Sequence, residues 1–594
     1  MSENVSVDMS QHFYRASAAD FKSVPGSPLA YWISDTLRNI FSEWPSLGEV
    51  SDPRQGLATT DNNLFCRNWQ EVSLNNIGFN CPSRSKAEEL KLKWFPFNKG
   101  GGFRKWYGNN DTLVNWENDG REIKENIIRK YPYLNGNPDF VAKNANKYFL
   151  PGITWGAISS AYFSVRWDDQ GFIPSNAGMK IYANSKDDLI KLIGFLNTKL
   201  TVELIGSMSA TLNFDQGLIK RLPVNLSVLG VGENAIFLAK KDWDSYETSW
   251  DFSSLPLLAK DTKQPTLEAS YKTLRANWLA STLEMQRLEE ENNRIFIDAY
   301  GLEDELTPEV PLNEITLTCN PHYRYRGDLT EQEREDRLQS DTIVELISYA
   351  IGCMMGRYSL DREGLVYANE NNDGFTELVA EGAYKSFPAD DDGILALTAE
   401  EWFEEDIANR FREFLAQVWG KGSLQQNIDF VAQSLCLYAL KARSGETSME
   451  VIRRYLSTQF FKDHMSMYKR RPIYWLFSSG KHKAFECLVY LHRYNESTLA
   501  RMRTEYVIPH TARLSAYATR LAARIEAADS TAERNRLNRE QKKIHDQQAE
   551  LAAFDEQLRH AADQRIQLDL DDGVKVNYGK FGNLLAEVKA ITGK

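Results

Sequence analysis

The sequence has few cysteines and no long apolar run. Its cysteines are isolated from one another, with no Cys-x-x-Cys pair: Cys66, Cys81, Cys319, Cys353, Cys436 and Cys487. This spacing excludes a zinc ribbon and a disulfide framework, and it favours reduced thiols in a cytoplasmic protein. No apolar stretch reaches 18 residues and the N-terminus has no hydrophobic signal region, so we expect neither a membrane span nor secretion.

Common catalytic motifs are also missing. The chain has no glycine-rich strand-to-helix turn for S-adenosylmethionine, no P-loop, no HExxH and no GxSxG. One near match, Asn320-Pro321-His322-Tyr323, is similar to the [NDS]-P-P-[YF] motif with which amino-methyltransferases hold a flipped base, but His stands in place of the second Pro. A catalytic role and a plain turn after a strand are both open interpretations, and the missing cofactor loop favours the turn.

Acidic residues are concentrated in one segment. Residues 361–406 hold fourteen acids and two bases, a charge of −12 that equals the net charge of the whole chain. The rest of the chain is therefore neutral with basic islands, so a DNA-binding role is not excluded by the acidic total. Asp390, Asp391 and Asp392 are consecutive, but the EF-hand spacing is absent, and we predict a solvated loop and no metal site.

The stretch from Lys91 to Tyr107 is a candidate nucleic-acid surface. Five basic side chains alternate with six aromatic ones around Gly100–Gly102, and residues 84–108 carry seven bases against two acids, a net charge of +5. Cations neutralise phosphates, aromatic faces stack on bases, and glycines let the backbone approach a ligand closely. An ordinary hairpin, with its aromatic residues in the core and a glycine turn, is the alternative interpretation.

A second basic island lies between Val451 and Lys483, where eight bases accompany Asp463 as the only acid. It is a candidate surface for the phosphate backbone. Docking of this island on the acidic segment 361–406 is the structural alternative. The residues singled out are Arg453, Arg454, Lys469, Arg470 and Arg471.

The length of 594 residues predicts several domains within an α+β fold. Short strand-like runs separated by Gly, Asn and Pro predict a β-rich domain, and helical periodicity predicts a mostly helical C-terminal region. The expected segments are 1–45 (polar lead-in and short helix), 46–226 (β-rich domain), 227–330 (connector with a long helix), 331–420 (mixed, acidic) and 421–594 (helical, with an antiparallel hairpin).

Several individual elements are predicted within these segments. Leu47–Val50 reads as a strand, and residues 421–510 read as helical. Ser530 and Glu533 predict a capping box that starts the second arm of the hairpin. The predicted helices are Tyr31–Phe41, Asp187–Ile205, Leu267–Asp298, Ile343–Met355 and Thr511–Ala528.

Long runs in the sequence resemble one protein family. The runs include KWFPFNKGGGFRKWYGN, IGFLNTKL, SMSATLNFDQGLIKRLPV and RRPIYWLFSSGKHKAFECLVYLHRYN. They resemble PglX, the adenine-specific DNA methyltransferase family of bacteriophage exclusion (BREX) defence systems, and the resemblance covers nearly the whole chain. It implies that the chain is the C-terminal half of such an enzyme, with residues 46–226 as a TaqI-like or Type I specificity-like target-recognition domain. S-adenosylmethionine is then expected in an N-terminal methyltransferase half, and no cofactor in this chain.

The resemblance also implies site residues and partners. Expected contacts to the DNA backbone are Lys91, Lys93, Lys99, Arg104 and Lys105; expected contacts to bases or sugars are Arg54, Gln55, Thr59, Asn98, Trp106 and Asn176. Expected partners are double-stranded DNA, the N-terminal methyltransferase domain, other BREX proteins and a DNA-mimicking phage inhibitor. A protein-assembly module without its own site choice is the alternative function, and a self-sufficient enzyme using Asn320–Tyr323 is a third hypothesis.

Overall fold

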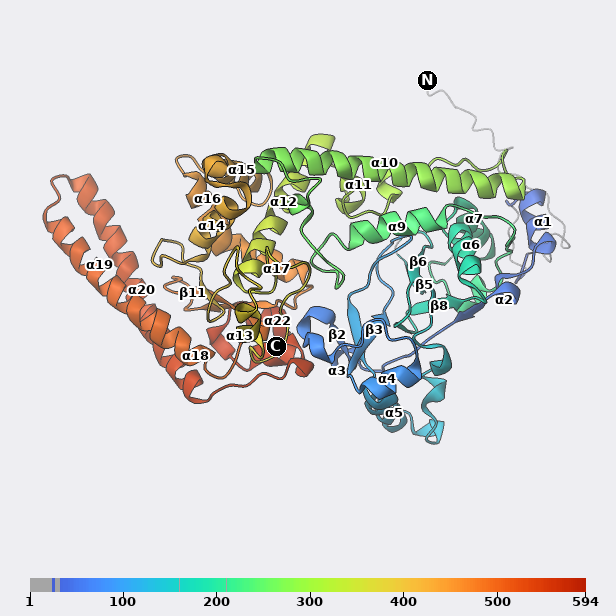
Figure 1. Ribbon diagram of the computed structural model, residues 1–594, viewed down its shortest axis with the longest axis horizontal. Coiled ribbons are helices and arrows are strands. Elements are labelled where there is room, and N and C mark those ends of the chain that lie inside the picture. The colour runs from blue at the N-terminus through green and yellow to red at the C-terminus, as the bar shows by residue number, and fades with distance from the viewer. Residues whose placement is uncertain (1–23, 27–31, 160, 210, 594) are drawn as a thin grey trace, which may run out of the picture. The chain divides into compact units, whose positions relative to one another are not determined.

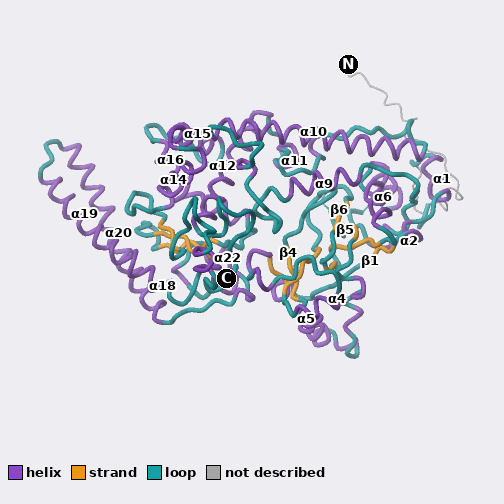
Figure 2. The backbone as a smooth tube through the Cα atoms, in the orientation of Figure 1, coloured by secondary structure: helices purple, strands orange, loops and turns teal. Residues whose placement is uncertain are grey.

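The computed structural model describes residues 24–26, 32–159, 161–209 and 211–593, and the predicted lead-in at residues 1–20 lies outside them. Helices and short strands are mixed along the chain, which confirms the α+β class (Figures 1 and 2). The chain forms two compact units, each built from separate stretches. Unit 1 comprises residues up to Cys66, 78–243 and 278–326; unit 2 comprises residues 67–77, 244–277 and 327–594. Neither unit follows the contiguous segments expected from the sequence.

The first sheet of unit 1 is antiparallel and has the strand order β1-β8-β5-β6. Its register pairs Ile153 with both Ile181 and Trp167. These three side chains are buried, so one face of the sheet belongs to the core. The strands are β1 (Asp52–Arg54), β5 (Gly152–Gly156), β6 (Val165–Asp168) and β8 (Gly178–Tyr182).

The second sheet of unit 1 is built around β3 (Trp94–Asn98), the first half of the basic and aromatic stretch. β3 pairs antiparallel with β4 (Thr112–Asn115) and parallel with β7 (Ile173–Pro174). All five residues of β3 are buried. Phe95 and Phe97 pack with Ile123 and Ile127 of α5 (Glu117–Lys130) in one apolar cluster. The aromatic residues of β3 are therefore core residues, as the hairpin interpretation expects, although residues 99–111 form a longer connection than a tight turn.

Two local predictions in unit 1 were wrong. Leu47–Val50 is a helix (α2) because Ser46 and Glu49 form a capping box, in which the Ser46 N–H donates to the Glu49 carboxylate at 2.6 Å. The single helix expected over 187–205 is two helices, α6 (Lys186–Leu196) and α7 (Lys199–Met208). The break occurs because the Thr198 hydroxyl caps α7, accepting from the Thr201 N–H at 3.1 Å.

The remaining helices of unit 1 surround these sheets. The predicted helix at 31–41 is α1 and starts at its cap Ser34, whose hydroxyl accepts from the Leu37 N–H. α10 contributes residues to both units, consistent with its interpretation as a connector. The bounds are α1 (Asp35–Glu43), α3 (Asn62–Phe65), α4 (Arg84–Leu90), α8 (Gln216–Ile219), α9 (Gly232–Trp243), α10 (Leu267–Tyr300) and α11 (Pro321–Arg324).

Unit 2 contains a three-stranded sheet that the sequence did not predict. Its strands β9 (Ile394–Ala396), β10 (Tyr474–Ser478) and β11 (Glu486–Tyr490) have the order β10-β11-β9 and pair antiparallel. The prediction that residues 421–510 are helical was wrong here. β10 and β11 are apolar on both faces, so their sequences lack the alternation of apolar and polar residues by which a strand is recognised. The helices before α19 are α12 (Glu331–Met354), α13 (Phe375–Ala380), α14 (Ile407–Trp419), α15 (Leu424–Leu437), α16 (Ser448–Tyr455), α17 (Phe461–Met467) and α18 (Thr498–Arg501).

The predicted helical hairpin is present in unit 2. α19 (Ile508–Glu526) and α20 (Thr531–Asp563) run antiparallel as a long pair (Figure 1). Ser530 caps α20 by accepting from the Glu533 N–H, which is one of the two hydrogen bonds of the predicted capping box. Four apolar residues of α20 that follow one another at seven-residue spacing are all buried: Leu537, Ile544, Leu551 and Leu558. The chain ends with α21 (Val574–Gly579) and α22 (Val588–Thr592).

Glu550 of α20 attaches this hairpin to the turn between β10 and β11. Its carboxylate accepts from the Ser479 hydroxyl at 2.7 Å, the His482 N–H at 2.6 Å and the Ala484 N–H at 3.1 Å. Backbone N–H groups of this turn thus bind an internal carboxylate.

The acidic run Asp390–Asp392 is a loop, as predicted, but only Asp391 of the three is exposed to solvent. The Asp390 carboxylate accepts from the backbone N–H groups of Asp392 and Gly393. Asp392 is buried and accepts from the Tyr506 hydroxyl at 3.1 Å. The run therefore shapes the chain that enters β9. Among the described residues, no helix combines the length and apolar content needed to cross a bilayer.

We expect Glu550→Gln to loosen the turn between β10 and β11. The change removes the charge that strengthens three hydrogen bonds, each worth about 1.5–3 kcal/mol when one partner is ionised. Hydrogen–deuterium exchange of residues 479–485 should become faster. Glu556→Gln is the matched control, because Glu556 is exposed on the same helix and pairs with Arg559. Unchanged exchange at 479–485 in Glu550→Gln would contradict the anchoring role.

We expect Asp392 to make unit 2 less stable as the pH rises from about 4 to about 7. Burial, and then the neighbouring Asp390, raise the pKa of Asp392 from 3.8 to about 7. The folded state therefore binds more protons than the unfolded state in this range, and stability falls with increasing pH by up to about 4 kcal/mol. Asp392→Asn should flatten the dependence of the unfolding temperature on pH. An equally steep dependence in the variant would show that another group causes it.

Candidate nucleic-acid interface

Four loops of unit 1 meet at glycines and form a surface that we call the loop junction. It consists of residues 55–57, 98–102, 156–159 and 175–178. A Cβ placed on Gly178 would lie 2.3 Å from the Asn98 carbonyl oxygen, and one on Gly56 would lie 2.0 Å from the Pro174 carbonyl oxygen. Real side chains do not fit at these distances, so glycine is what allows the loops to approach so closely.

Backbone hydrogen bonds join the loops of the junction. The Ala157 N–H donates to the Ala177 carbonyl at 2.8 Å, and the Asn176 N–H donates to the Leu57 carbonyl at 3.1 Å. Gly100 has a φ of 86°, and a Cβ there would lie 3.0 Å from the Ala177 carbonyl oxygen. The four loops are thus held together by main-chain contacts that leave the outer side chains available.

The outer side chains of the loop junction are basic, amide-bearing and apolar. Lys99 and Asn176 are exposed, and Gln55 is half-buried with its amide oxygen 3.0 Å from the Lys143 ammonium. Ile158 is 73% exposed. An ammonium can neutralise a phosphate, and Asn and Gln amides can read the edge of an adenine. The structure therefore brings together three of the residues predicted from sequence: Gln55, Lys99 and Asn176.

A fully buried ion pair lies beneath the junction. The Lys180 ammonium of β8 is 2.5 Å from the Asp168 carboxylate of β6, and both side chains are 0% exposed. Asn98, at the end of β3, donates to the other Asp168 oxygen at 3.1 Å. Gly152 makes room for this arrangement, because a Cβ there would lie 2.9 Å from the Lys180 side chain. Asp168 thus connects the first sheet of unit 1 to the second.

Desolvation disfavours the charged forms of both Asp168 and Lys180. Burial raises the pKa of Asp168 and lowers the pKa of Lys180, while their mutual attraction counteracts both shifts. Burial also lowers the pKa of the neighbouring Arg166 to about 10. The Arg166 guanidinium lies 3.4 Å from the Gly100 carbonyl oxygen and so contacts the loop from below. Asn98, predicted to contact bases, is a 5% exposed part of this support instead.

Three other predicted DNA contacts are buried and paired, so we correct their assignment. The Lys105 ammonium lies 2.6 Å from the Glu289 carboxylate, and the Trp106 indole N–H donates to the same carboxylate at 2.8 Å. Arg104 donates to the Thr316 carbonyl at 3.1 Å and lies 3.8 Å from Asp242. Groups with these internal partners cannot reach a phosphate without breaking them, and they hold the 103–107 segment in place.

The remaining predicted contacts in unit 1 lie outside the loop junction or are engaged within the protein. Arg54 pairs with Asp52 at 2.5 Å. Thr59 is buried and donates to Asn62 at 2.6 Å. Lys91 is exposed at the C-cap of α4, and the Lys93 ammonium lies 5.7 Å from the Trp94 ring centroid.

The second basic island of unit 2 is partly neutralised. Arg453 pairs with Asp406, the last acid of the acidic segment, so for this residue the structure shows the docking alternative. Arg454 pairs with Glu446 at 2.6 Å, and Arg471 lies 3.7 Å from Glu71. Lys469 and Arg470 are exposed. The island therefore presents a smaller positive charge than its sequence indicates.

The Asn320–Tyr323 tetrapeptide has a structural role in this protein. The Asn320 amide donates to the Leu312 and Ile315 carbonyls at 2.7 and 2.8 Å, and its oxygen accepts from the His322 N–H. The Tyr323 hydroxyl donates to the Phe103 carbonyl at 2.5 Å. The oxygen of Asn320, which would have to accept from the exocyclic amine of a base, already accepts from the His322 N–H, and the residue is fully buried, which argues against the self-sufficient-enzyme hypothesis.

The described residues also do not fit an S-adenosylmethionine site. Adenosine-containing cofactors of this kind commonly bind at the carboxyl edge of a parallel sheet, after a glycine-rich turn. In the described ranges, the only strand pair that is parallel is β3–β7, and its register covers two residue pairs. We therefore derive no catalytic step for this chain.

Sequence reasoning missed the residues that support the junction. Asp168, Lys180 and Glu289 had no local signal, because each pairs with a residue from another part of the chain. Lys143 was missed for the same reason: its position beside Gln55 depends on contacts between residues 88 positions apart. The glycines at 56, 100, 156 and 178 were the signal of close loop packing in the sequence.

Two known proteins resemble this chain. The adenine-specific methyltransferase BrxX of Escherichia coli O9:H4 (strain HS) is 46% identical over 579 residues, which make up 97% of this chain and 46% of BrxX. The adenine-specific methyltransferase PglX of Lacticaseibacillus casei (strain Zhang) is 36% identical over 581 residues, 96% of this chain and 45% of PglX. The chain thus spans about half the length of each relative. No family model matches the chain. That the matching half is the C-terminal one stays a prediction.

We expect Lys105→Met to destabilise unit 1, whereas Lys99→Met should not. Removing one member of a buried pair leaves Glu289 charged and only partly satisfied, at a cost of about 3–5 kcal/mol. Scanning calorimetry should show a lower unfolding temperature for Lys105→Met and an unchanged unfolding temperature for Lys99→Met. The double variant Lys105→Met/Glu289→Gln should recover part of the loss. Equal unfolding temperatures for Lys105→Met and the unmodified protein would restore Lys105 as a candidate DNA contact.

Proposed function

We propose that this chain recognises a specific site in double-stranded DNA on behalf of an adenine-specific methyltransferase of a BREX defence system. The observation that carries the proposal is its 46% identity, over 97% of its residues, to a protein named adenine-specific methyltransferase. The loop junction of unit 1 supplies a place for recognition. In this proposal the methyl group comes from S-adenosylmethionine bound by the part of the enzyme that this chain does not match.

The proposed division of labour at the loop junction follows from its chemistry. Lys99, exposed beside the glycine turn, neutralises a phosphate and positions the duplex. Asn176 and Gln55 present amides that can bond to base edges, where bidentate pairing discriminates by about 1–3 kcal/mol. The buried ion pair below fixes the loops, so that little ordering is needed on binding.

Methylation of a base in a duplex requires that the base leave the stack and that the enzyme grip both sides of the site. This chain, by binding the duplex, would allow the enzyme to grip the second side of the site. Lys469 and Arg470 of unit 2 stay predicted contacts to the phosphate backbone. Arg453, Arg454 and Arg471 are less suited to this role because each already faces a carboxylate.

A second proposed function is docking of other proteins of the defence system. The helical hairpin α19–α20 favours it, because its outer faces are exposed and charged while its inner face is apolar. A DNA-mimicking inhibitor would compete with DNA for the loop junction instead.

A cytoplasmic location is part of the same proposal. Deletion of residues 421–594 should abolish protein docking. It should leave the preference for a DNA site intact if unit 1 suffices for recognition.

We expect selection from a random duplex library, at two salt concentrations, to enrich one asymmetric site. Lys99→Ala should weaken binding to all duplexes and lower the salt slope by about 1, because one phosphate contact is lost. Asn176→Ala should instead relax the preference at one base position by about 1–3 kcal/mol. Lys191→Ala is the control, since Lys191 lies on α6 outside the junction and pairs with Asp187. Binding without sequence preference would overturn the proposal.

A further inference from the structure

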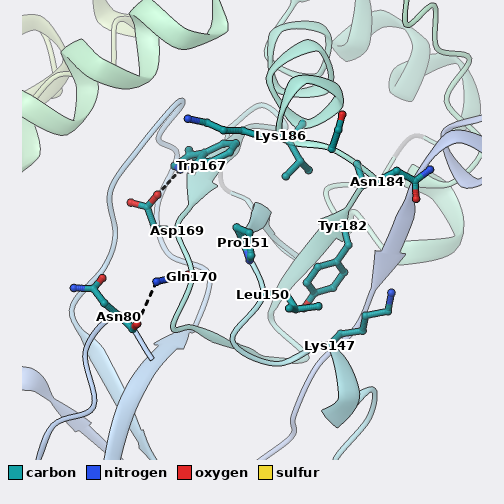
Figure 3. A pocket seen from close by; sticks show the side chains of 13 residues that line it. Asn80, Lys147, Leu150, Pro151, Trp167, Asp169, Gln170, Tyr182, Asn184 and Lys186 are labelled. Atoms are coloured by element: carbon teal, nitrogen blue, oxygen red, sulfur yellow. Dashed lines mark hydrogen bonds between the residues drawn. The ribbon is translucent and has the colours of Figure 1, made fainter. Parts of the chain in front are cut away.

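A pocket of about 590 Å³ lies in unit 1 at the end of β8 away from the loop junction (Figure 3). Gly178, which belongs to the junction, begins β8, whereas Tyr182 ends that strand and lines the pocket. Volumes of about 300–1,000 Å³ are typical of sites for small ligands. The pocket is therefore a separate feature with room for a ligand the size of a nucleotide.

Several polar groups of the pocket have no partner within the described part of the protein. Lys186, at the start of α6, makes no ion pair with a described residue, and its ammonium lies 5.9 Å from the Trp167 ring centroid. The Tyr182 hydroxyl is buried and has no hydrogen-bond partner there either. Asn184 is exposed at the rim. A buried hydroxyl without a partner is unfavourable, and a ligand oxygen or nitrogen would relieve that cost.

The charges at the pocket leave an excess of positive charge. Lys147 lies 3.2 Å from Asp52, which also pairs with Arg54. Asp169 lies 3.4 Å from Lys240 and accepts from the Trp167 indole N–H at 2.8 Å. Lys186 is the lining cation that makes no ion pair with a described residue, so a negatively charged ligand group matches it. A phosphodiester carries one negative charge, whereas the phosphate of a free mononucleotide carries nearly two at neutral pH.

The apolar side of the pocket suits a base. Leu150 and Pro151 are exposed and lie beside the Tyr182 ring in Figure 3, across the pocket from Lys186. Planar bases gain free energy by contact with apolar and aromatic surfaces regardless of their sequence. The exposed amides of Asn80, Gln170 and Asn184 can bond to base edges at the rim.

We infer that this pocket binds one unpaired nucleotide of a DNA strand, with its phosphodiester at Lys186 and its base against Leu150, Pro151 and Tyr182. The site is separate from the loop junction, and the choice of a DNA strand as its ligand rests on the proposed function. It would bind a nucleotide that has left the duplex stack, whatever the sequence of that duplex.

The test compares two labelled duplexes of one sequence, one perfectly paired and one with a single unpaired adenine. Fluorescence anisotropy with the full chain should show about fivefold tighter binding of the duplex with the unpaired adenine. Lys186→Ala should abolish that preference, because the phosphodiester loses its cation, and leave binding of the paired duplex unchanged. Tyr182→Phe should reduce the preference without lowering the unfolding temperature, since the hydroxyl it removes has no partner in the protein.

Lys191→Ala is the matched control, because Lys191 lies on the same helix, pairs with Asp187 and does not line the pocket. Equal affinity for the two duplexes, or a preference that survives Lys186→Ala, would overturn the inference. Competition by free dAMP as strong as that of the strand would also overturn it, since the site would then take a mononucleotide. Binding of the paired duplex by Lys99→Ala is a separate measurement. Its loss would concern the loop junction and would leave the pocket untouched.

Discussion

The Asp168–Lys180 ion pair, fully buried and bonded to Asn98, is the interaction on which unit 1 depends most. It joins β6 and β8 of one sheet to β3 of the other, through Asn98 at the edge of the loop junction. Two charges without solvent are costly, and they are stable only when they face each other and their remaining lone pairs are satisfied. Asp168 meets this requirement in part, through Lys180 and the Asn98 amide, and so holds the end of β3 against β6 and β8.

The side chains proposed to contact DNA differ from those of this framework because they are exposed to solvent. Basic residues of the same stretch have opposite roles: Lys105 is paired with Glu289 inside the protein, whereas Lys99, six positions earlier, is exposed at the loop junction. A surface that is already rigid loses less conformational entropy when it binds. The structure therefore supports a recognition surface made of a few outer side chains on a fixed backbone, rather than a long basic arm.

Local features could be predicted from the sequence, and long-range pairing could not. The hairpin α19–α20 was predicted because apolar spacing and the Ser530 cap are local signals. Lys105 and Trp106 were assigned to DNA because their partner Glu289 lies more than 180 positions away and leaves no trace nearby. The strands β10 and β11 were missed because a strand buried on both faces shows no alternation.

The most direct test of this account is hydrogen–deuterium exchange of the full chain with and without its selected duplex. Binding should slow exchange in residues 55–57, 98–102, 156–159 and 175–178, while the amides next to Asp168 and Lys180 exchange slowly in both states. Protection confined to residues 451–471, or fast exchange around the buried ion pair in the free protein, would contradict it.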